Sequence, residues 1–367
     1  MSIDTSDRHT LTGADYLSAD VYALEQANLF HGGWFFAGRG DPIGRGGRRV
    51  VDVAGQSVLV VRDLDGTLYA HANVCRHRGS LLCETDQADG QGSIMCPYHA
   101  FTYALDGRLI ATPRVDNDEL DRSELSLWPV ALAEWQGFVF VSLNPNPKPL
   151  IEWLHLHASH LLTFEHLEMG ALRTAARTQQ TVAANWKVLF ENYQECLHCA
   201  LVHPELVELV PTYRSGNVID RNRDDGGVHL QPGANSFSAN GASSLPLLPN
   251  MSPDQADIYQ GAVAFPNMFV DVTGTSVIVS GLYPNGAGET VVVMEYLVAP
   301  DTLAQPDFDM SDIVEFSELV GKQDYVVCER VQRGVASHSF DHGVLTHKDQ
   351  YVLDFVNHYL AARAVES

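Results

Sequence analysis

The spacing of apolar and polar residues changes along the chain and divides it into three stretches. Over residues 14–36 the apolar positions recur at helical spacing, and the pattern ends near Gly32 and Gly33. Short β-branched runs then alternate with turn residues up to about Asn144, and Asp-Gly pairs in "DLDGTLY" and "YALDGRLIATP" indicate hairpins. The pattern predicts a helix followed by a small antiparallel β-domain, which ends at the linker "NPNPKP".

The third stretch mixes both patterns. A strand-like run, "ARTQQTVAA", precedes a helix that we expect Asn185 to cap. Residues 215–250 are rich in Gly, Asn, Ser and Pro, which predicts a long loop. Three strand-like runs, "GAVAFPNMFVDV", "TSVIVSGLY" and "ETVVVMEYLVA", precede two helical patterns at residues 311–335 and 347–364. Strands followed by helices predict an α+β domain with an antiparallel sheet.

Composition narrows the class of protein. A chain of 367 residues with 45% hydrophobic and 19% charged residues predicts a globular protein of about two domains. The net charge of −23 argues against nucleic acid or an anionic membrane as a partner. No signal pattern or membrane-spanning apolar run is present, so we expect a cytoplasmic protein. Six cysteines are too few for a disulfide scaffold and predict metal ligands or buried thiols.

The β-domain contains a first set of candidate metal ligands. "CRHRGS" and "CPYHAF" each present one Cys and one His on a turn, namely Cys75, His77, Cys96 and His99, with 18 residues between the two pairs. Two thiolates and two imidazoles suit tetrahedral zinc or a Rieske cluster. Zinc turns usually supply two ligands of one kind, as in Cys-x2-Cys, whereas one soft and one borderline ligand per turn suits a cluster with unlike irons. These residues resemble the Rieske motif.

The stretch "ENYQECLHCALVHPEL" contains a second set. Cys196 and Cys199 have a zinc-like spacing, while Glu195, His198 and His203 suit a redox-active metal. We expect His198 on a helix one turn after Glu195, and we expect Pro204 to end that helix. These two cysteines, and Cys328 further along the chain, also fit the role of buried small apolar side chains.

A third ligand for this set is predicted on the C-terminal helix. Asp324 interrupts an apolar stripe formed by Val320, Val327, Cys328, Val331 and Val335. A lone buried carboxylate is costly unless it is paired or binds a metal. With two histidines it would complete the two-His-one-carboxylate triad of non-haem iron oxygenases.

"NWKVLFENYQECLHCALVHPEL" and "QDYVVCERVQRG" resemble the two catalytic motifs of Rieske non-haem iron oxygenase α-subunits. The resemblance implies a helical segment at residues 1–36 that packs on the catalytic domain and a Rieske [2Fe-2S] domain at residues 37–147. It implies an Fe(II) catalytic domain at residues 148–367, with a helix-grip, Bet v1-like sheet around C-terminal helices. Cys75, His77, Cys96 and His99 would hold the cluster, and His198, His203 and Asp324 the iron. Glu195 would link the iron site to His99 of a neighbouring subunit in a homotrimer.

The resemblance also implies a reaction. Electrons would come from a separate NAD(P)H-dependent reductase, with or without a ferredoxin, and O2 would be used to hydroxylate or demethylate a small substrate. "ENYxECxHC" and "CExxQRG" resemble members that act on choline, betaine and carnitine. Five aromatic residues could contact such a cation, although the sheet core is their more usual place (Phe237, Phe265, Phe269, Tyr283 and Tyr296).

Three alternatives stay open at this point. An aromatic ring-hydroxylating dioxygenase acting on an aromatic acid would share every metal ligand. A Rieske electron-transfer protein without oxygenase activity would need only the β-domain, and a zinc-stabilised interaction module would need no iron. The loop at residues 215–250 is expected either to gate the pocket or to be a surface excursion.

Overall fold

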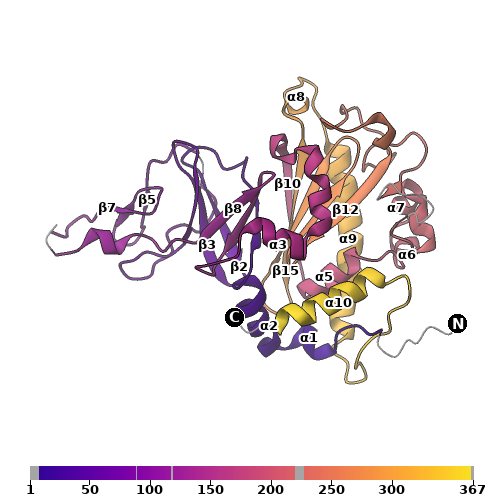
Figure 1. Cartoon of the computed structure of the whole chain (residues 1–367), viewed down its shortest axis with the longest axis horizontal. Helices are drawn as coiled ribbons and strands as arrows, with labels where there is room; N and C mark the ends of the chain where they lie inside the picture. Colours follow the sequence, from indigo (N-terminus) through magenta and orange to yellow (C-terminus); the bar gives the residue numbers. More distant parts are fainter. Residues whose placement is uncertain (1–7, 88, 117–118, 220–226, 365–367) are drawn as a thin grey trace. The chain divides into compact units, whose positions relative to one another are not determined.

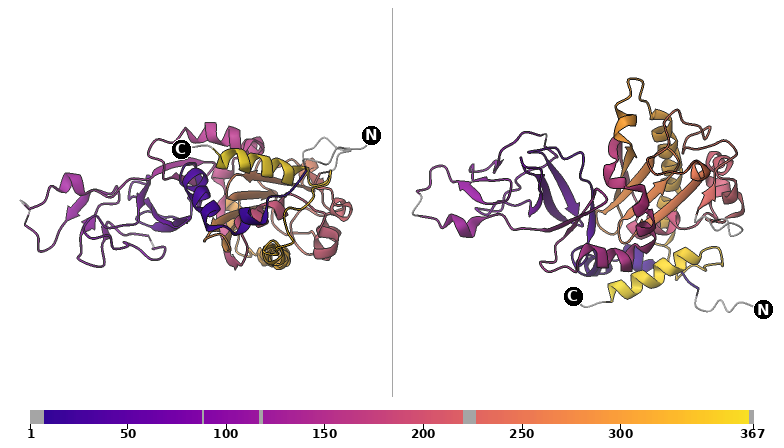
Figure 2. Two further views of the ribbon diagram at one scale, coloured as in Figure 1. Left: turned by 90° about the horizontal axis from the view of Figure 1, so that it is seen from below. Right: turned by 45° about the horizontal axis from the view of Figure 1, so that its top comes forward.

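The computed structural model describes residues 8–87, 89–116, 119–219 and 227–364 (Figures 1 and 2). The chain forms two compact units, one of Phe30–Trp153 and one of Met1–Leu29 together with Leu154–Ser367. Within the described ranges no helix is both long enough and apolar enough to cross a membrane.

The unit Phe30–Trp153 is built from three small antiparallel sheets. Their strand orders are β1-β9-β8, β2-β3-β4 and β5-β6-β7. The strands are β1 (Phe35–Arg39), β2 (Arg48–Val53), β3 (Gln56–Arg62), β4 (Leu68–Ala72), β5 (Ile94–Met95), β6 (Thr102–Tyr103), β7 (Leu109–Ala111), β8 (Ala131–Trp135) and β9 (Phe138–Ser142). Both Asp-Gly hairpins are confirmed, since Gly66 joins β3 to β4 at φ 102° and Gly107 joins β6 to β7 at φ 92°.

The other unit is organised by one antiparallel sheet of order β10-β15-β14-β13-β12-β11, which confirms the predicted α+β class. Its strands are β10 (Arg173–Val182), β11 (Val228–His229), β12 (Ile258–Ala264), β13 (Met268–Val272), β14 (Val277–Pro284) and β15 (Thr290–Val298). "GAVAFPNMFVDV" forms two strands rather than one, because Phe265, Pro266 and Asn267 make the turn between β12 and β13.

Three helices of this unit bear on the site, namely α5 (Trp186–Tyr193), α9 (Ser311–Gly334) and α10 (Gln350–Arg363). Helix α9 packs against both β10 and α5. Shorter helices are α4 (Ser159–Leu162), α6 (Cys199–Val202), α7 (Pro204–Leu209) and α8 (Pro300–Leu303), and α3 (Leu150–His157) has the same length as α5. Both predicted C-terminal helices are confirmed, although the apolar stripe on α9 is interrupted at Val331, which is 46% exposed, while Val335 beyond it is buried.

The N-terminal helix is broken where a single helix was predicted. Helix α1 (Gly13–Leu17) ends at Ser18, and α2 (Ala19–Glu25) continues into a π-helical turn (Gln26–Phe30). Ser18 has extended backbone angles, and its side chain accepts hydrogen bonds from the amides of Asp20 and Val21. This serine therefore caps α2 and divides the predicted helix in two. The spacing of the apolar residues alone does not indicate this break. Phe35 and Phe36 belong to β1 and not to the helix.

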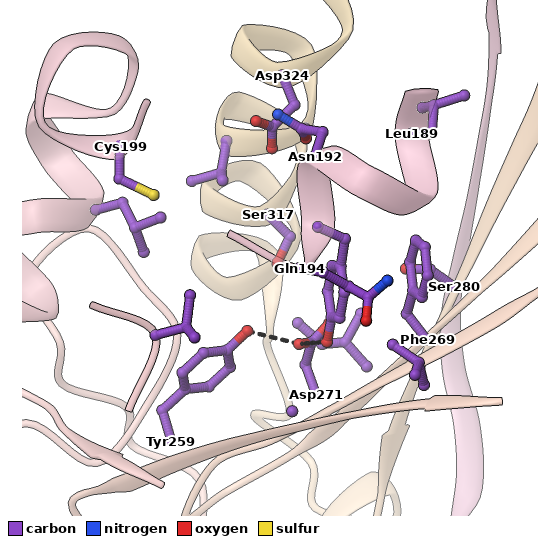
Figure 3. A pocket seen from close by; sticks show the side chains of 18 of the residues that line it. Leu189, Asn192, Gln194, Cys199, Tyr259, Phe269, Asp271, Ser280, Ser317 and Asp324 are labelled. Carbon is purple, nitrogen blue, oxygen red and sulfur yellow. Dashed lines mark hydrogen bonds between the residues drawn. The ribbon is translucent and has the colours of Figure 1, made fainter. Parts of the chain in front are cut away.

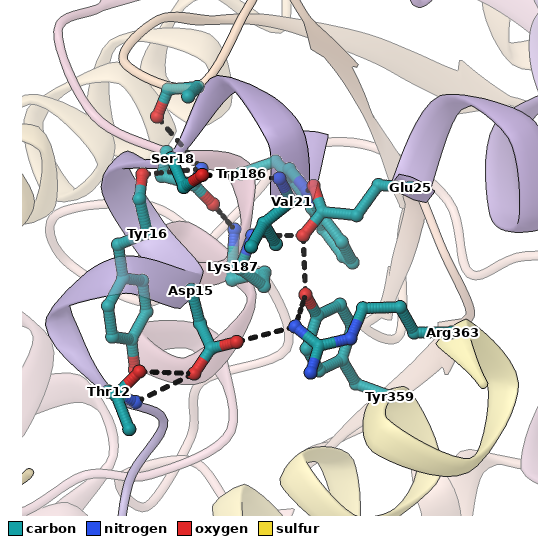
Figure 4. Close-up of polar contacts among 12 residues, drawn as sticks. Thr12, Asp15, Tyr16, Ser18, Val21, Glu25, Trp186, Lys187, Tyr359 and Arg363 are labelled. Carbon is teal, nitrogen blue, oxygen red and sulfur yellow. Dashed lines mark hydrogen bonds and ion pairs between the residues drawn. The ribbon is translucent and has the colours of Figure 1, made fainter. Parts of the chain in front are cut away.

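A buried polar network joins α2, α5 and α10 (Figure 4). Glu25 and Lys187 are fully buried, and the Lys187 Nζ donates to Glu25 Oε1 at 2.5 Å. The same carboxylate accepts from Trp186 Nε1 at 2.9 Å and from the Tyr359 hydroxyl at 2.6 Å. Three donors thus satisfy the buried charge, which would otherwise be costly.

We expect Lys187→Met to lower the free energy of unfolding by about 3–5 kcal/mol, because Glu25 then carries an uncompensated buried charge. The double variant Glu25→Gln with Lys187→Met should recover much of this loss, since it removes the second charge as well. Urea unfolding followed by tryptophan fluorescence measures both. Lys322→Met is the matched control, because the Lys322 amine pairs with Glu318 at 2.9 Å on the surface. Equal unfolding midpoints for Lys187→Met and the control would contradict the prediction.

Candidate functional site

Helix α5 begins at a cap that the sequence predicts correctly. The Asn185 side chain accepts from the Lys187 amide at 3.0 Å and donates to the carbonyls of Tyr16 (3.0 Å) and Ala287 (2.8 Å). The cap is therefore fixed from three sides, and it sets the position of α5 relative to α1 and to the turn before β15.

The end of α5 differs from the prediction. The helix stops at Tyr193, so Glu195 and His198 lie in a turn and not on a helix. His198 precedes α6, and His203 ends α6 directly before Pro204 starts α7, as the proline predicts. The turn directs Glu195 and His198 toward one another as a helix would. The predicted backbone conformation is therefore wrong, although the two side chains lie together as expected.

Three of the predicted ligands meet at one point. His203 Nε2 lies 2.9 Å from Asp324 Oδ1, and His198 Nε2 lies 3.3 Å from the same oxygen. The first His is 1% exposed, while the side chains of the second and of Asp324 are 17% and 22% exposed. Two imidazole nitrogens and one carboxylate from two distant segments therefore face a common position.

The outer nitrogens of both imidazoles are held by side chains behind them. His198 Nδ1 lies 2.5 Å from Glu195 Oε1, and His203 Nδ1 lies 2.8 Å from Gln323 Oε1. Gln323 Nε2 in turn donates to Glu205 Oε2 at 3.0 Å. Metal-bound histidines characteristically donate their second N–H to such an acceptor. This arrangement leaves both Nε2 atoms directed at the common position and fits a divalent metal such as Fe(II).

The charges of these groups are strongly coupled. Burial lowers the pKa of His198, but hydrogen bonds to Asp324 and Glu195 outweigh it and raise the pKa to about 9. The pKa of Asp324 is lowered despite its burial, because both imidazoles donate to it. A metal that binds here displaces the imidazole proton, so metal uptake is expected to release protons.

The cysteines beside the site do not compete for a metal. The Cys199 sulfur and the nitrogens of His198 and His203 lie within 4.8 Å of one another. Cys199 forms a disulfide with Cys196, however, so the interpretation of this pair as free buried thiols is wrong. A disulfide offers no thiolate to a metal. Cys328 is a free buried thiol, as predicted.

The trio of proposed metal ligands, His198, His203 and Asp324, opens onto a cavity of about 580 Å³. Figure 3 shows part of its lining. Residues of β11 to β15 form one wall, mostly at alternate positions of each strand, and residues of α4, α5, α9, α10 and the α6–α7 region contribute to the others. Of the five predicted aromatics, Phe237 and Phe269 line the cavity, whereas Phe265, Tyr283 and Tyr296 do not. Among the described lining residues there is no Lys or Arg. The predicted loop contributes on both sides of residues 220–226, which lie outside the described ranges.

One carboxylate in the cavity was not predicted. Asp271 lies on β13, and its Oδ1 accepts from the hydroxyls of Tyr193 at 2.6 Å and Tyr259 at 2.5 Å. Burial raises the pKa of Asp271 to about 6, although both hydroxyls lower it. No pattern in the sequence indicated this residue, because an Asp in an alternating strand usually faces solvent.

The β-rich unit brings the other predicted ligands together. Cys75 and Cys96 are buried, and burial raises the pKa of the Cys75 thiol, with the neighbouring Cys96 adding to the effect. The rings of His77 and His99 lie 4.7 Å apart, and His99 Nδ1 is a buried nitrogen without a hydrogen-bond partner among the described residues. The Tyr103 hydroxyl lies 3.3 Å from Cys75 Sγ. Two soft and two borderline donors, one of them buried and unpartnered, fit a Rieske cluster.

Comparison with known protein families identifies both parts of the chain. Residues 167–364 match the model of the ring hydroxylating alpha subunit (catalytic domain), and residues 33–133 match that of the Rieske [2Fe-2S] domain. The glycine betaine monooxygenase oxygenase subunit of Chromohalobacter salexigens is 30% identical, over 96% of this chain and 85% of that protein. The carnitine monooxygenase oxygenase subunit of Escherichia coli strain K12 is 26% identical, over 90% of this chain and 85% of that protein.

Known structures share the fold. The quaternary ammonium Rieske monooxygenase CntA in complex with L-carnitine has a TM-score of 0.77 at 22% identity, covering 98% of this chain and 97% of that chain. Naphthalene 1,2-dioxygenase from Rhodococcus sp. has a TM-score of 0.76 at 19% identity, covering 98% and 95%. These similarities confirm the predicted fold class.

We expect Gln323→Ala to weaken iron binding at the trio by about 10–100-fold, because His203 loses the acceptor that orients its ring. Titration of the apo-protein with Fe(II) under anaerobic conditions measures the affinity. Lys322→Ala, one residue earlier on α9 and exposed, should leave the affinity unchanged. An unaltered affinity in Gln323→Ala would show that the hydrogen bond does not position His203.

We expect Tyr103→Phe to lower the reduction potential of the Rieske centre by tens of millivolts, because a hydrogen bond to a ligand sulfur stabilises the reduced cluster. Spectroelectrochemical titration measures this potential. Tyr98→Phe is the matched control, since Tyr98 is 58% exposed and lies on the ligand loop beside His99. A shift of the same size in both variants would argue against a specific role for the Tyr103 hydroxyl.

Proposed function

Because this chain belongs to the Rieske non-haem iron oxygenases, we propose that it is the oxygenase component that hydroxylates or demethylates a quaternary amine. Proteins of this family carry a [2Fe-2S] cluster and a mononuclear iron. In this proposal O2 is the second substrate, and a separate NAD(P)H-dependent reductase, with or without a ferredoxin, supplies the electrons. The cytoplasmic location of the protein stays a prediction.

The proposal assigns a part to each predicted residue. Cys75, His77, Cys96 and His99 hold the cluster in a domain of residues 37–147, and His198, His203 and Asp324 hold the iron in a domain of residues 148–367. The N-terminal segment, predicted as residues 1–36, packs on the latter domain up to Leu29, and the chain from Phe30 on belongs to the β-rich unit. The contacts of His198 and His203 with Asp324, and of their outer nitrogens with Glu195 and Gln323, support the iron ligands. The buried, unpartnered His99 Nδ1 supports the cluster ligands.

The observation that carries the substrate class is the charge of the cavity. Its described lining contains Asp271 and several aromatic rings but no Lys or Arg, so it suits a cation better than an anion. An aromatic acid would place its carboxylate near Asp271 without a counter-ion. The relatives named for glycine betaine and carnitine point to the same class.

The chain's own residues contribute positioning and exclusion of water. Bound iron supplies the activation of dioxygen. Glu195 holds the Nδ1 proton of His198, so that Nε2 faces the common position with its lone pair. We propose that the same carboxylate links this imidazole to His99 of a neighbouring subunit in a homotrimer, which gives the electron a hydrogen-bonded route. The largely apolar walls keep water away from the carbon that reacts.

The test is a substrate panel with the iron- and sulfide-loaded protein, a surrogate reductase and NADH. We expect oxygen consumption coupled to conversion of trimethylammonium compounds, with 18O2 incorporated into the product. Asp324→Ala should abolish turnover while the absorbance of the cluster persists. Glu195→Gln should slow turnover by at least about tenfold with both metal contents retained, because the amide keeps one acceptor oxygen for His198 and cannot accept from a second imidazole. The loss of an acceptor in a metal site's outer shell has effects of that size.

Glu318→Gln, an exposed carboxylate on α9, is the control for the Glu195 variant. Oxidation of aromatic acids without any amine would replace the proposed substrate class by that of a ring-hydroxylating dioxygenase. Reduction of the cluster by the reductase without oxygen consumption for any substrate would instead favour an electron-transfer protein.

A further inference from the structure

We propose that Asp271 is the specificity-determining residue of the cavity and that its carboxylate binds the cationic group of the substrate. The inference rests on the proposed function, because it concerns the same cavity. It adds a named anchor, with a defined hydrogen-bond environment, to a substrate class that the metal ligands leave open.

The fold places Asp271 where a substrate can reach it. Asp271 and Phe269 are two positions apart on β13 and face the cavity, while Val270 between them is fully buried on the other side. Figure 3 shows Asp271 near the sheet and Asp324 well apart from it on α9, with the side chains of Ser317 and Gln194 in the region between them. A small molecule that occupies the cavity therefore lies between the anchor and the metal position.

The sheet is adapted to hold the two hydroxyls on this carboxylate. Gly261 of β12 is the direct partner of Asp271 in the register. A Cβ on Gly261 would lie 2.9 Å from the Tyr193 hydroxyl, so a side chain there would displace it. The ring of Tyr193 is stacked on Phe269 at 4.1 Å, and the ring of Tyr259 on Phe237 at 5.6 Å. Both phenols are thus fixed by packing before any ligand binds.

A structural role alone does not account for a charged residue at this position. Both hydroxyls donate to the same oxygen, Oδ1, and an amide oxygen would accept those two bonds equally well. A carboxylate brings in addition a negative charge that burial penalises. Within the described part of the chain no Lys, Arg or His forms an ion pair with Asp271. A ligand cation would provide the missing counter-charge.

The surroundings favour a quaternary ammonium group among cations. Such a group has no N–H to donate and spreads its charge over methyl groups, so it is recognised by charge and by aromatic faces. Tyr259 contacts both Phe237 and the ring of Tyr213, which lies 6.4 Å from it, so the carboxylate is flanked by aromatic surface. Ile278 of β14 and Val292 of β15 add apolar surface to the same wall.

The test compares two ligands that differ only in charge. Choline and 3,3-dimethylbutan-1-ol have the same shape, but the second has carbon in place of the ammonium nitrogen. Isothermal titration calorimetry on the metal-loaded protein gives the ratio of their affinities. We expect the wild type to prefer choline by at least about thirtyfold, the size expected for a buried charge pair. Asp271→Asn should bring the ratio close to one and leave the affinity for the alcohol nearly unchanged.

Two controls separate charge from fold. Tyr259→Phe removes one hydroxyl and keeps the ring and the carboxylate, so choline should still bind better than the alcohol, with the ratio lowered by no more than a few-fold. Asp257→Asn removes a carboxylate that pairs with His229 at 2.9 Å and does not line the cavity, so it should preserve both affinities. Because each ratio is measured on one protein, a general loss of folded material cancels.

The possible outcomes distinguish this inference from the proposed function. An equal choline preference in Asp271→Asn and the wild type overturns the anchor, even if amines are oxidised, and so does a wild type without any preference. A preference that Asp271→Asn abolishes supports the anchor, even if no amine is turned over. In that last case it is the proposed oxidation of quaternary amines that fails.

Discussion

The buried ion pair between Lys187 and Glu25 fixes the helix on which the site depends. Lys187 lies in the first turn of α5, where Asn185 caps the helix, and Glu25 brings α2 and α10 onto it through Tyr359 and Lys187. One turn later the Tyr16 hydroxyl donates to Glu191, whose pKa burial raises to about 7. The residues that follow line the cavity, so the orientation of the active region is set by contacts made at the opposite end of the helix.

The cavity contains two carboxylates of one residue type in opposite electrostatic environments. Asp324 receives two imidazoles, which lower its pKa despite burial, whereas Asp271 receives two neutral phenols and its pKa rises. The first environment prepares an anionic ligand for a metal cation. The second leaves a negative charge without a basic partner among the described residues, which is a site for an organic cation. The two carboxylates thereby divide metal binding from substrate recognition.

The sequence indicated the proposed metal ligands because their chemistry leaves a short-range signature. His198 and His203 precede a helix-starting proline within one motif. Asp324 breaks a stripe whose other residues are apolar, as expected for a helix face that packs on the core. Gln323 and Asp271 have no such signature, because a hydrogen bond to a distant imidazole and a position on one face of a sheet are fixed only by tertiary packing. The end of α5 at Tyr193 and the Cys196–Cys199 disulfide were missed for a related reason. Helical spacing and a tight turn both bring positions three residues apart together.

The aromatic residues show which extra fact would have completed the prediction. Five aromatic residues were candidates for contact with the substrate. Strand alternation assigns residues to the two faces of a sheet but does not show which face lines the cavity. Once Phe269 is placed in the cavity, the period of two also places Asp271 there, and the register then selects Gly261 opposite it. On this central strand an acidic residue lies two positions from an aromatic one and opposite a glycine. That pattern therefore indicates a binding site only after the face of the sheet that lines the cavity is known. Substrate specificity in this chain is encoded at that level, and the metal chemistry is encoded in the motifs.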